Sequence, residues 1–287
     1  MIAFYLSGNP THDRAITALY EGCPEERKLI EGFRYEPSDV AVIFGVYKSK
    51  VVISWPRGEI FRQQRQNNKD VIVLETGYIN RGDGENHHYA AGFNGLNGRA
   101  DFKNKGMPDD RYIKLSHEFP HQAVMKSYCQ PRETGHVILC GQVPWDASVD
   151  HVDHVAWLNE TAMKLKEQTR RRIVFRPHPL AKIPQIKWCE YSTAPLWRDL
   201  AWATAVVTFN SNTGVEALIN GVPVFAFDEG SMVWSICNKD LRRIDFPETP
   251  ARQRWLNDLC YAQWTLNEMR SGETWKHLTR STTAPAT

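Results

Sequence analysis

The chain has 287 residues, and 35 Lys and Arg against 33 Asp and Glu give a formal net charge of +2 at pH 7. A hydrophobic fraction of 42% is ordinary for a globular protein and excludes a wholly disordered or fibrous chain. No apolar run approaches the ~18 residues that cross a bilayer, and the start of the chain lacks the basic region of a signal peptide. We therefore expect a cytoplasmic protein of about two domains with no membrane partner.

The first 115 residues mix short β-branched segments with polar loops. The strand candidates occupy residues 1–6, 39–45, 51–54 and 70–75. A polar stretch over 57–69 predicts a helix before the last of these strands, and this order favours a parallel sheet. Residues 76–106 are rich in Gly and Asn and predict a long loop, which in a compact domain is usually functional.

The second half alternates strands and helices. We expect strands over 136–143, 172–179, 205–212 and 222–228, and helices over 149–170, 195–203 and 213–220. Short loops between them are typical of a doubly wound α/β domain. A final amphipathic helix over 252–270 and a polar, frayed tail complete the prediction, with two α/β domains meeting near residues 116–135.

Polar residues follow two of these strands, where ligands of open α/β sheets bind. Arg176 and His178 alternate around Pro177 and can both donate to a phosphate. The alternative is a plain strand end with a capped histidine.

The second strand delivers Ser211, Asn212 and Thr213 to a helix N-terminus, which favours an anion. Gly214 would let a ligand or another backbone segment approach closely, and Glu216 could accept hydrogen bonds from ribose hydroxyls; alternatively, these residues only cap the helix. Together the two strand ends favour a nucleotide diphosphate. P-loop and GxGxxG patterns are absent, which disfavours a kinase or a Rossmann dehydrogenase.

The segments RPHP and NSNTGVEALINGVPV resemble the donor half of sugar-nucleotide glycosyltransferases, in particular the capsule-polysaccharide synthase and bacterial Kdo transferase group. GQVPWDAS resembles that group's glycine loop. The resemblance implies an α/β fold of GT-B type, with two Rossmann-like domains, a cleft between them and a C-terminal helix crossing back. It implies an acceptor domain over 1–125, a nucleotide-sugar domain over 126–250, and a helix and tail over 251–287.

The resemblance extends more weakly into the first half. LETGYINR resembles a segment that brings Glu75 to the cleft, and Asp101 is the candidate general base. GFNGLNGRADF resembles phage glycosyltransferases that decorate hydroxymethylated DNA bases. The preferred acceptor is therefore a 5-hydroxymethylpyrimidine in double-stranded DNA, in the host cytoplasm if a phage encodes the protein.

The predicted site residues fall into two binding sets besides the catalytic pair. The donor set is Gln142, Arg176, His178, Ser211, Asn212, Thr213 and Glu216. The acceptor set is Tyr78, Arg81, His87, His88, Phe93, Arg99 and Lys103. Further basic residues that could hold DNA phosphates are Lys48, Lys50, Arg62, Arg65 and Lys105.

We expect no metal and no cofactor, with a nucleotide sugar such as a UDP-sugar as co-substrate. The only trace of a metal-binding DxD motif is Asp109–Arg111, a weak alternative. Two other functions stay open: transfer to capsule or lipopolysaccharide saccharides, and a non-catalytic nucleotide-binding module. The sequence leaves the oligomeric state open.

Overall fold

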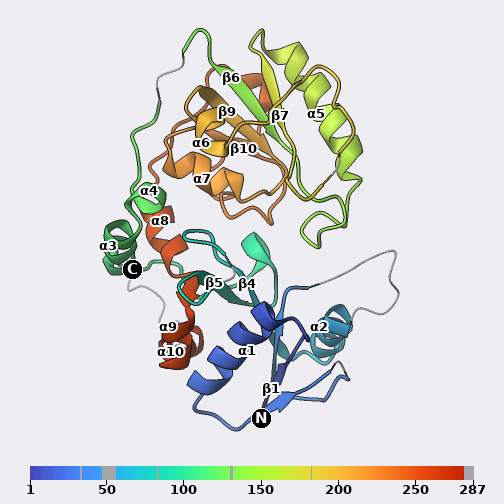
Figure 1. Ribbon diagram of the computed structural model, residues 1–287, viewed down its shortest axis with the longest axis vertical. Coiled ribbons are helices and arrows are strands. Elements are labelled where there is room, and N and C mark those ends of the chain that lie inside the picture. The colour runs from blue at the N-terminus through green and yellow to red at the C-terminus, as the bar shows by residue number, and fades with distance from the viewer. Residues whose placement is uncertain (33, 47–55, 83, 130–131, 182, 281–287) are drawn as a thin grey trace. The chain divides into compact units, whose positions relative to one another are not determined.

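The computed structural model describes residues 1–32, 34–46, 56–82, 84–129, 132–181 and 183–280 (Figure 1). The chain forms two compact units. The first joins Met1–Pro120 to Gln253–Thr287, and the second is His121–Arg252. The predicted strand over 51–54 lies outside the described residues, as do Lys48 and Lys50.

The first unit is built on a six-stranded sheet of order β11-β5-β4-β3-β1-β2. Its strands are β1 (Ile2–Tyr5), β2 (Arg27–Ile30), β3 (Val40–Phe44), β4 (Asp70–Thr76), β5 (His88–Phe93) and β11 (Gln263–Thr265). β1 to β4 are parallel, whereas β5 runs antiparallel to β4 and β11 antiparallel to β5. The carboxyl ends of the four parallel strands therefore meet at one edge.

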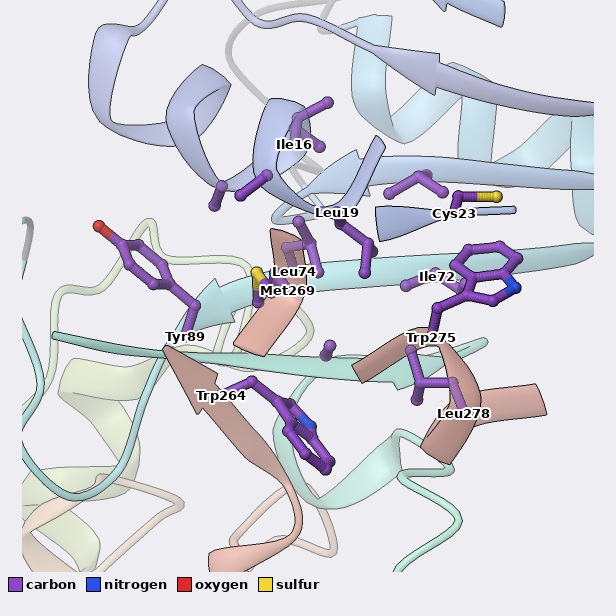
Figure 2. Packing of buried hydrophobic residues seen from close by; sticks show 14 of the residues in the cluster. Ile16, Leu19, Cys23, Ile72, Leu74, Tyr89, Trp264, Met269, Trp275 and Leu278 are labelled. Atoms are coloured by element: carbon purple, nitrogen blue, oxygen red, sulfur yellow. The ribbon is translucent and has the colours of Figure 1, made fainter. Parts of the chain in front are cut away.

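Helices cover both faces of this sheet. They are α1 (Pro10–Gly22), α2 (Pro56–Gln66), α3 (Asp110–Glu118), α8 (Gln253–Cys260), α9 (Leu266–Arg270) and α10 (Glu273–Thr279). α1 packs Ile16 and Leu19 over Ile72 and Leu74 of β4 (Figure 2). Ile60 of α2 packs in the core cluster of the opposite face. The helix expected over 57–69 is confirmed.

The C-terminal segment returns to the first unit, as the predicted fold requires, but its form differs from the prediction. The single helix expected over 252–270 is wrong, because β11 interrupts it and pairs with β5. The expected frayed tail is also wrong up to residue 280, since α10 buries Trp275 and Leu278 beside α1 (Figure 2). A short local pattern does not reveal a strand that is stabilised by a partner more than 170 residues earlier in the chain.

The long loop expected over 76–106 is wrong in part. β5 lies inside it, followed by the short 3-10 helix η1 (Asn97–Arg99). Gly92 explains why the strand escaped prediction: a Cβ there would lie 2.8 Å from the ring of Phe102. Glycine is thus used for close packing within the strand, while it weakens the sequence signal for one.

The second unit holds a five-stranded parallel sheet of order β10-β9-β6-β7-β8. The strands are β6 (His136–Cys140), β7 (Ile173–Arg176), β8 (Glu190–Tyr191), β9 (Ala203–Thr208) and β10 (Val224–Ala226). The helices are α5 (His154–Gln168), α6 (Leu196–Leu200) and α7 (Thr213–Ile219), and a 3-10 helix, η2, covers Leu241–Arg243. The short helix α4 (Pro120–Ala123) lies at the point where the chain passes from the first unit to the second. The predicted alternation of strands and helices is confirmed.

Sequence features set the boundaries of these helices. α5 begins at His154 rather than at 149, because the Asp153 carboxylate accepts from the backbone N–H of Ala156 and caps it. α7 ends before Gly221, which adopts φ +79°. α5 buries Leu158 and Leu165 against the sheet.

Candidate functional site

The second unit has a topological switch point between β6 and β9. From β6 the chain proceeds to β7 and β8 on one side, and then returns to β9 and β10 on the other. The loops that follow β6 and β9 therefore leave neighbouring strands in opposite directions. Ligands of open parallel sheets bind at the carboxyl ends of the strands at such a point.

Side-chain hydrogen bonds tie these two loops together. Gln142 Nε2 donates to Asn210 Oδ1 over 2.6 Å, and the Asn210 backbone N–H donates to Gln142 Oε1 over 3.1 Å. Asn210 Nδ2 donates in turn to Asp228 Oδ1, 2.8 Å away in the loop after β10. All three side chains are buried. Gln142, a predicted donor-binding residue, thus uses both ends of its amide to hold the loops in place.

Two histidines complete this network. The backbone N–H of Gln142 donates to Nε2 of His154 over 3.0 Å. Burial lowers the pKa of His154 to about 4, so the ring is neutral at pH 7 and can accept that bond. His151 Nε2 lies 3.2 Å from Asp228 Oδ2. The polar groups at the switch point are therefore fixed by the fold itself.

The predicted residues at the start of α7 lie beside this network. The backbone N–H of Thr213 donates to Ser211 Oγ, and the Ser211 hydroxyl donates to Thr213 Oγ1, each over 3.2 Å. Asn212 is the N-cap residue, and it is half-buried like Ser211, Thr213 and Glu216. The structure thus brings these four donor-set residues together at the start of one short helix.

Gly214 lies close to two side chains of its own unit. A Cβ at this position would lie 3.3 Å from Val233 Cγ2 and 3.4 Å from Val224 Cγ1. The absence of a side chain therefore serves the close packing of α7, and the approach of a ligand stays a prediction.

Arg176 and His178 are placed differently from each other. Arg176 Nη1 donates to Asp199 Oδ2 over 2.7 Å and to the carbonyl of Ala194 over 2.6 Å, so a buried carboxylate already balances its charge. The backbone N–H of Leu180 donates to Nδ1 of His178 over 3.2 Å. In its neutral form the ring therefore carries its proton on Nε2, a nitrogen that could donate to a ligand oxygen.

The first unit has its own polar cluster at the carboxyl edge of its parallel strands. His12, in the first turn of α1, stacks on Phe44 of β3 with ring centroids 4.0 Å apart and planes at 8°. Arg57 Nη1 lies 3.5 Å from His12 Nδ1 and donates to the Phe44 carbonyl. Glu75 Oε2 and Arg57 Nη1 would each lie 3.6 Å from a Cβ at Gly45. We call these three residues, His12, Arg57 and Glu75, the β3-edge cluster.

Local hydrogen bonds orient the members of this cluster. Glu75 Oε1 accepts from the backbone N–H of Thr76 over 2.9 Å, and Arg81 donates to the Thr76 hydroxyl over 3.3 Å. On the other side, Asn9 Oδ1 caps α1 and fixes the turn that carries His12. Glu75 therefore keeps one carboxylate oxygen on its own strand and directs the other toward Gly45.

Asp101, the predicted base, does not lie at the carboxyl edge of the sheet where Glu75 lies. It pairs through its backbone with Phe93, which stands opposite Ile72 of β4, three residues before Glu75. This offset corresponds to roughly 10 Å along the strand. The two residues of the predicted catalytic pair are therefore not brought together.

The carboxylate of Asp101 forms an ion pair with Lys103, with 2.7 Å between Oδ2 and Nζ, and its side chain is 58% exposed. Partial burial acts to raise the pKa of Asp101, but the hydrogen bonds and charge of Lys103 outweigh it and hold the pKa below its ordinary value. A lowered pKa makes a carboxylate a weaker proton acceptor.

Several residues of the predicted acceptor set belong to the interior. Tyr78 is buried and donates to Asn97 Oδ1 over 3.3 Å, and burial raises its pKa. His88 is buried, which lowers its pKa to about 4. His87 Nδ1 accepts from the backbone N–H of Gly84 over 2.7 Å. Tyr78 and His88 would have to leave the core to contact a DNA base.

The remaining acceptor residues lie nearer the surface. Arg81 and Arg99 are exposed, and Lys103 Nζ lies 5.8 Å from the ring centre of Phe93, which is half-buried. Lys103 and Phe93 therefore lie beside Asp101, while Arg81 lies near Glu75.

The basic residues around α2 are balanced by carboxylates. Arg62 bonds Glu59, and Arg65 Nη1 lies 3.3 Å from Asp70 Oδ1. This surface consequently offers less net positive charge than the run of basic residues in the sequence indicates.

The residues Asp109–Arg111 are structural. Asp110 Oδ1 accepts from the Tyr261 hydroxyl over 2.6 Å, and Arg111 forms a buried ion pair with Glu268. Among the residues that the structure describes, no group of three or more His, Cys, Asp or Glu side chains could hold a metal ion. No helix in the described part of the chain has the length and apolar character to span a bilayer.

Asn210, Asp228, His12 and Arg57 escaped the sequence reasoning. The rule that found Ser211 would also have found His12, which follows the predicted strand over 1–6, and Asn210, which directly precedes Ser211. Arg57 also follows a predicted strand, the one over 51–54, but its contact with His12 depends on the packing of α2 against β3.

Comparisons with known proteins agree with this architecture. No protein-family model matches the chain, and no curated protein sequence matches it. Among solved structures, the chain is similar to the β-Kdo 2,7 transferase of Thermosulfurimonas dismutans KpsC, with TM-score 0.57 and 13% identity over 96% of this chain and 98% of that one. It is also similar to the β-Kdo 2,4 transferase of the same KpsC, with TM-score 0.57 and 15% identity over 91% of this chain and 89% of that one. The likeness confirms the predicted fold: two Rossmann-like α/β units of the GT-B type.

Proposed function

We propose that this protein is a glycosyltransferase that moves a sugar from a nucleotide-sugar donor to a hydroxyl acceptor. The observation that carries the proposal is the network of Gln142, Asn210 and Asp228, which fixes the loops at the switch point of the second sheet. Ser211 and Thr213 lie in the segment after β9. Preorganised donors at such a position suit a diphosphate whose charge grows as it leaves.

The reaction would form a bond between the acceptor oxygen and the anomeric carbon of the sugar. The bond between that carbon and the phosphate oxygen breaks, and the nucleotide leaves with the electron pair. His178 would donate through Nε2 to a phosphate oxygen. Arg176 would mainly hold the local structure in place rather than bind the phosphates, because Asp199 already balances its charge.

The acceptor proton would pass to a carboxylate, and Glu75 is better placed for this than Asp101. Glu75 lies at the carboxyl edge of the first sheet, where open sheets bind ligands. Asp101 is paired with Lys103, which lowers its pKa. A positioned general base typically contributes 10²–10⁴-fold to the rate.

A saccharide hydroxyl is the acceptor that the described residues favour. The solved structures of similar fold are named as Kdo transferases. Arg62 and Arg65 of α2 have carboxylate partners, and Tyr78 and His88 are buried. A hydroxymethylated DNA base stays the second prediction, supported by the exposed Arg99 and the basic Lys103 beside Phe93.

The test is nucleotide release from a panel of UDP-, GDP- and CMP-sugars, measured with and without acceptor. We expect one nucleotide class to be turned over, and Ser211→Ala to reduce that turnover. The matched control is Ser116→Ala, an α3 residue of the other unit whose hydroxyl bonds only Ile113 among the contacts described. Absence of both binding and turnover with every donor would contradict the proposal, and binding without turnover would leave only a nucleotide-binding module.

The acceptor is tested with the active donor. Oligosaccharides and a duplex that contains 5-hydroxymethylcytosine are incubated in parallel, and mass spectrometry identifies the product that gains one sugar. Mass gained only by the duplex would reverse the preference stated above.

A further inference from the structure

We propose that two turns at the carboxyl edge of the second sheet form an apolar clamp for the nucleobase of the nucleotide donor. The clamp consists of Trp145, in the turn after β6, and Leu180, in the turn after β7. This inference rests on the proposed function. It adds the base to the phosphates and the ribose, for which the sequence already predicted residues.

A β-turn that closely follows β6 carries Trp145. The backbone N–H of Asp146 donates to the Val143 carbonyl over 3.0 Å. Pro144 and Trp145 therefore occupy the two central positions of the turn, and proline presets the backbone angle of the first of them. The Trp145 side chain is 58% exposed, and it has no hydrogen bond or ring contact within the described part of the chain. The fold thus holds an indole ring in water at the edge where ligands of such sheets bind.

The loop after β7 repeats this arrangement. The backbone N–H of Ala181 donates to the His178 carbonyl over 3.0 Å, and Pro179 and Leu180 lie between these two residues. The backbone N–H of Leu180 donates to Nδ1 of His178 over 3.2 Å, which restricts the turn further. Leu180 is 79% exposed. A second proline turn therefore holds a second large apolar side chain in water.

The two turns leave the sheet from neighbouring positions. β6 and β7 are adjacent and parallel, with Cys140 opposite Arg176 (Figure 1). The Trp145 turn follows Cys140, and the Leu180 turn follows Arg176. Paired strands lie about 5 Å apart. Both apolar side chains are therefore carried by segments that begin side by side at the same edge.

Packing and hydrogen bonds hold the first turn on both sides. A Cβ at Gly141 would lie 2.9 Å from the ring of Phe175 and 3.1 Å from Ile183 Cδ1, so the chain leaves β6 directly against side chains of the β7 region. After the turn, the Ser148 carbonyl accepts from Asn210 Nδ2 over 2.7 Å. A turn that is fixed before the ligand arrives lowers the entropy cost of binding.

The chemistry of the two side chains selects a flat, weakly polar group. Trp145 offers a π face and Leu180 an aliphatic surface, and neither carries a charge for a phosphate. A nucleobase has two flat faces, and every base can stack on an aromatic ring. β9, β6 and β7 are consecutive in the sheet, so the clamp lies next to the segment with Ser211 and Thr213 that is proposed for the diphosphate. One nucleotide can therefore reach both.

The binding test uses CMP, UMP and GMP as probes, with ribose 5-phosphate as the probe that lacks a base. NMR of the full chain, with protonated Trp and Leu side chains in a deuterated background, records contacts between ligand protons and these side chains. Trp145→Phe and Leu180→Met assign the two sets of signals by their loss. We expect the base protons of the tightest nucleotide to contact both residues. Contacts that lack either residue, contacts from ribose protons only, or no binding of any nucleotide would overturn the clamp.

Variants measure the contribution of each side. Both side chains are exposed, so their replacement should leave the fold intact. We expect Trp145→Ala to weaken nucleotide binding about 5- to 150-fold, as the loss of a base–aromatic stack does, and Leu180→Ala about threefold or more. The matched control is Trp197→Ala, on α6 of the same unit and 67% exposed, which should change binding less than twofold. Equal losses of nucleotide and ribose 5-phosphate affinity in Trp145→Ala would show that the turn does not bind the base.

Two outcomes separate this inference from the proposed function. Base contacts with both residues, but no nucleotide release from any sugar donor, would keep the clamp and refute the glycosyltransferase. Nucleotide release from a sugar donor without these contacts would keep the glycosyltransferase and refute the clamp.

Discussion

Arg111 is expected to be the main polar anchor of the C-terminal segment within the first unit. Its guanidinium donates to the carbonyls of Cys260 and Gln263, at 3.0 and 2.9 Å, and to both carboxylate oxygens of Glu268, at 2.9 and 3.2 Å. It also lies 3.9 Å from the ring centre of Trp264. One side chain thus joins α3 to α8, β11 and α9.

Replacement of Arg111 by Met would leave the Glu268 carboxylate in the interior with Lys114 as its remaining cation. Glu268 is only 7% exposed, whereas Lys114 is 50% exposed. Removal of one partner from a buried ion pair costs about 3–5 kcal/mol, because the other charge stays buried. Removal of an exposed partner costs about 0–1 kcal/mol, so Lys114→Met is the matched control.

The assay is urea unfolding of each variant combined with hydrogen exchange of the β11 amides, which reports on this unit alone. We expect Arg111→Met to lower the free energy of unfolding by about 3–5 kcal/mol and to speed β11 exchange in proportion. The double variant Arg111→Met with Glu268→Met should recover part of the loss. A loss below 1 kcal/mol in Arg111→Met, equal to that of Lys114→Met, would refute the reasoning.

Three further outcomes follow from single positions. In thermal unfolding, Gly221→Ala should destabilise the second unit by more than ~2 kcal/mol, since its Cβ would lie 2.1 Å from the Ser127 carbonyl oxygen. The control is Gly8→Ala, where φ is +75° but the space is open, and it should cost only ~1–2 kcal/mol. Asp101→Asn should lower turnover less than tenfold, and a ~10³-fold loss at unchanged donor affinity would restore Asp101 as the base. His88 has its pKa lowered to about 4 and therefore stays neutral in the folded state. As the pH falls from ~6.5 to about 4, the unfolded state binds the extra proton, so the free energy of unfolding falls by up to about 1.4 kcal/mol per pH unit. We expect His88→Asn to flatten that slope in pH-dependent denaturation, and an unchanged slope would contradict this prediction.

The second unit could be predicted from sequence almost element by element. Four of its five parallel strands are short, mostly buried runs such as Val137–Leu139, whereas the exposed two-residue strand β8 was not predicted. Its helices end at residues such as Gly221. The information that defines these elements is local, so reading the chain in order recovers them.

The first unit could be predicted only in part, and its C-terminal elements escaped prediction because they depend on distant partners. β11 is a three-residue strand, and α9 begins directly after it with a capping box between Thr265 and Glu268. The apolar spacing across both elements imitates one continuous helix. Only the pairing of β11 with β5 separates them, and no local pattern encodes that pairing.

The candidate site shows the same division. Ser211 and His178 follow strand ends and were predictable, as was Glu75 at the end of β4. Arg57 was not, because its position beside His12 depends on how α2 packs against β3. The role of Asp101 stays a prediction: its place in a motif-like segment is visible in the sequence, whereas its pairing with Phe93, away from Glu75, is not.

Asn210 offers a direct test of the network at the switch point. Its Nδ2 donates to Asp228 Oδ1 over 2.8 Å and to the Ser148 carbonyl over 2.7 Å. In Asn210→Asp, an oxygen replaces this donor, so a second carboxylate faces Asp228 in a buried position. Like charges in such a site raise the pKa of one carboxyl, and we expect a loss of about 2–4 kcal/mol at pH 7.

The sign of the pH dependence makes this prediction specific. The shared carboxyl pair would have a folded-state pKa above its unfolded value, so protonation favours the folded variant. The deficit relative to wild type should therefore be largest above the folded-state pKa and shrink as the pH falls toward ~4. Asn210→Ala removes the same donor without adding charge, and its deficit should vary less with pH. If Asn210→Asp shows an equal deficit at pH 4 and pH 7 in chemical denaturation, then Asp228 does not share this site with residue 210 as a charged group, and the network does not hold the loops in the way described.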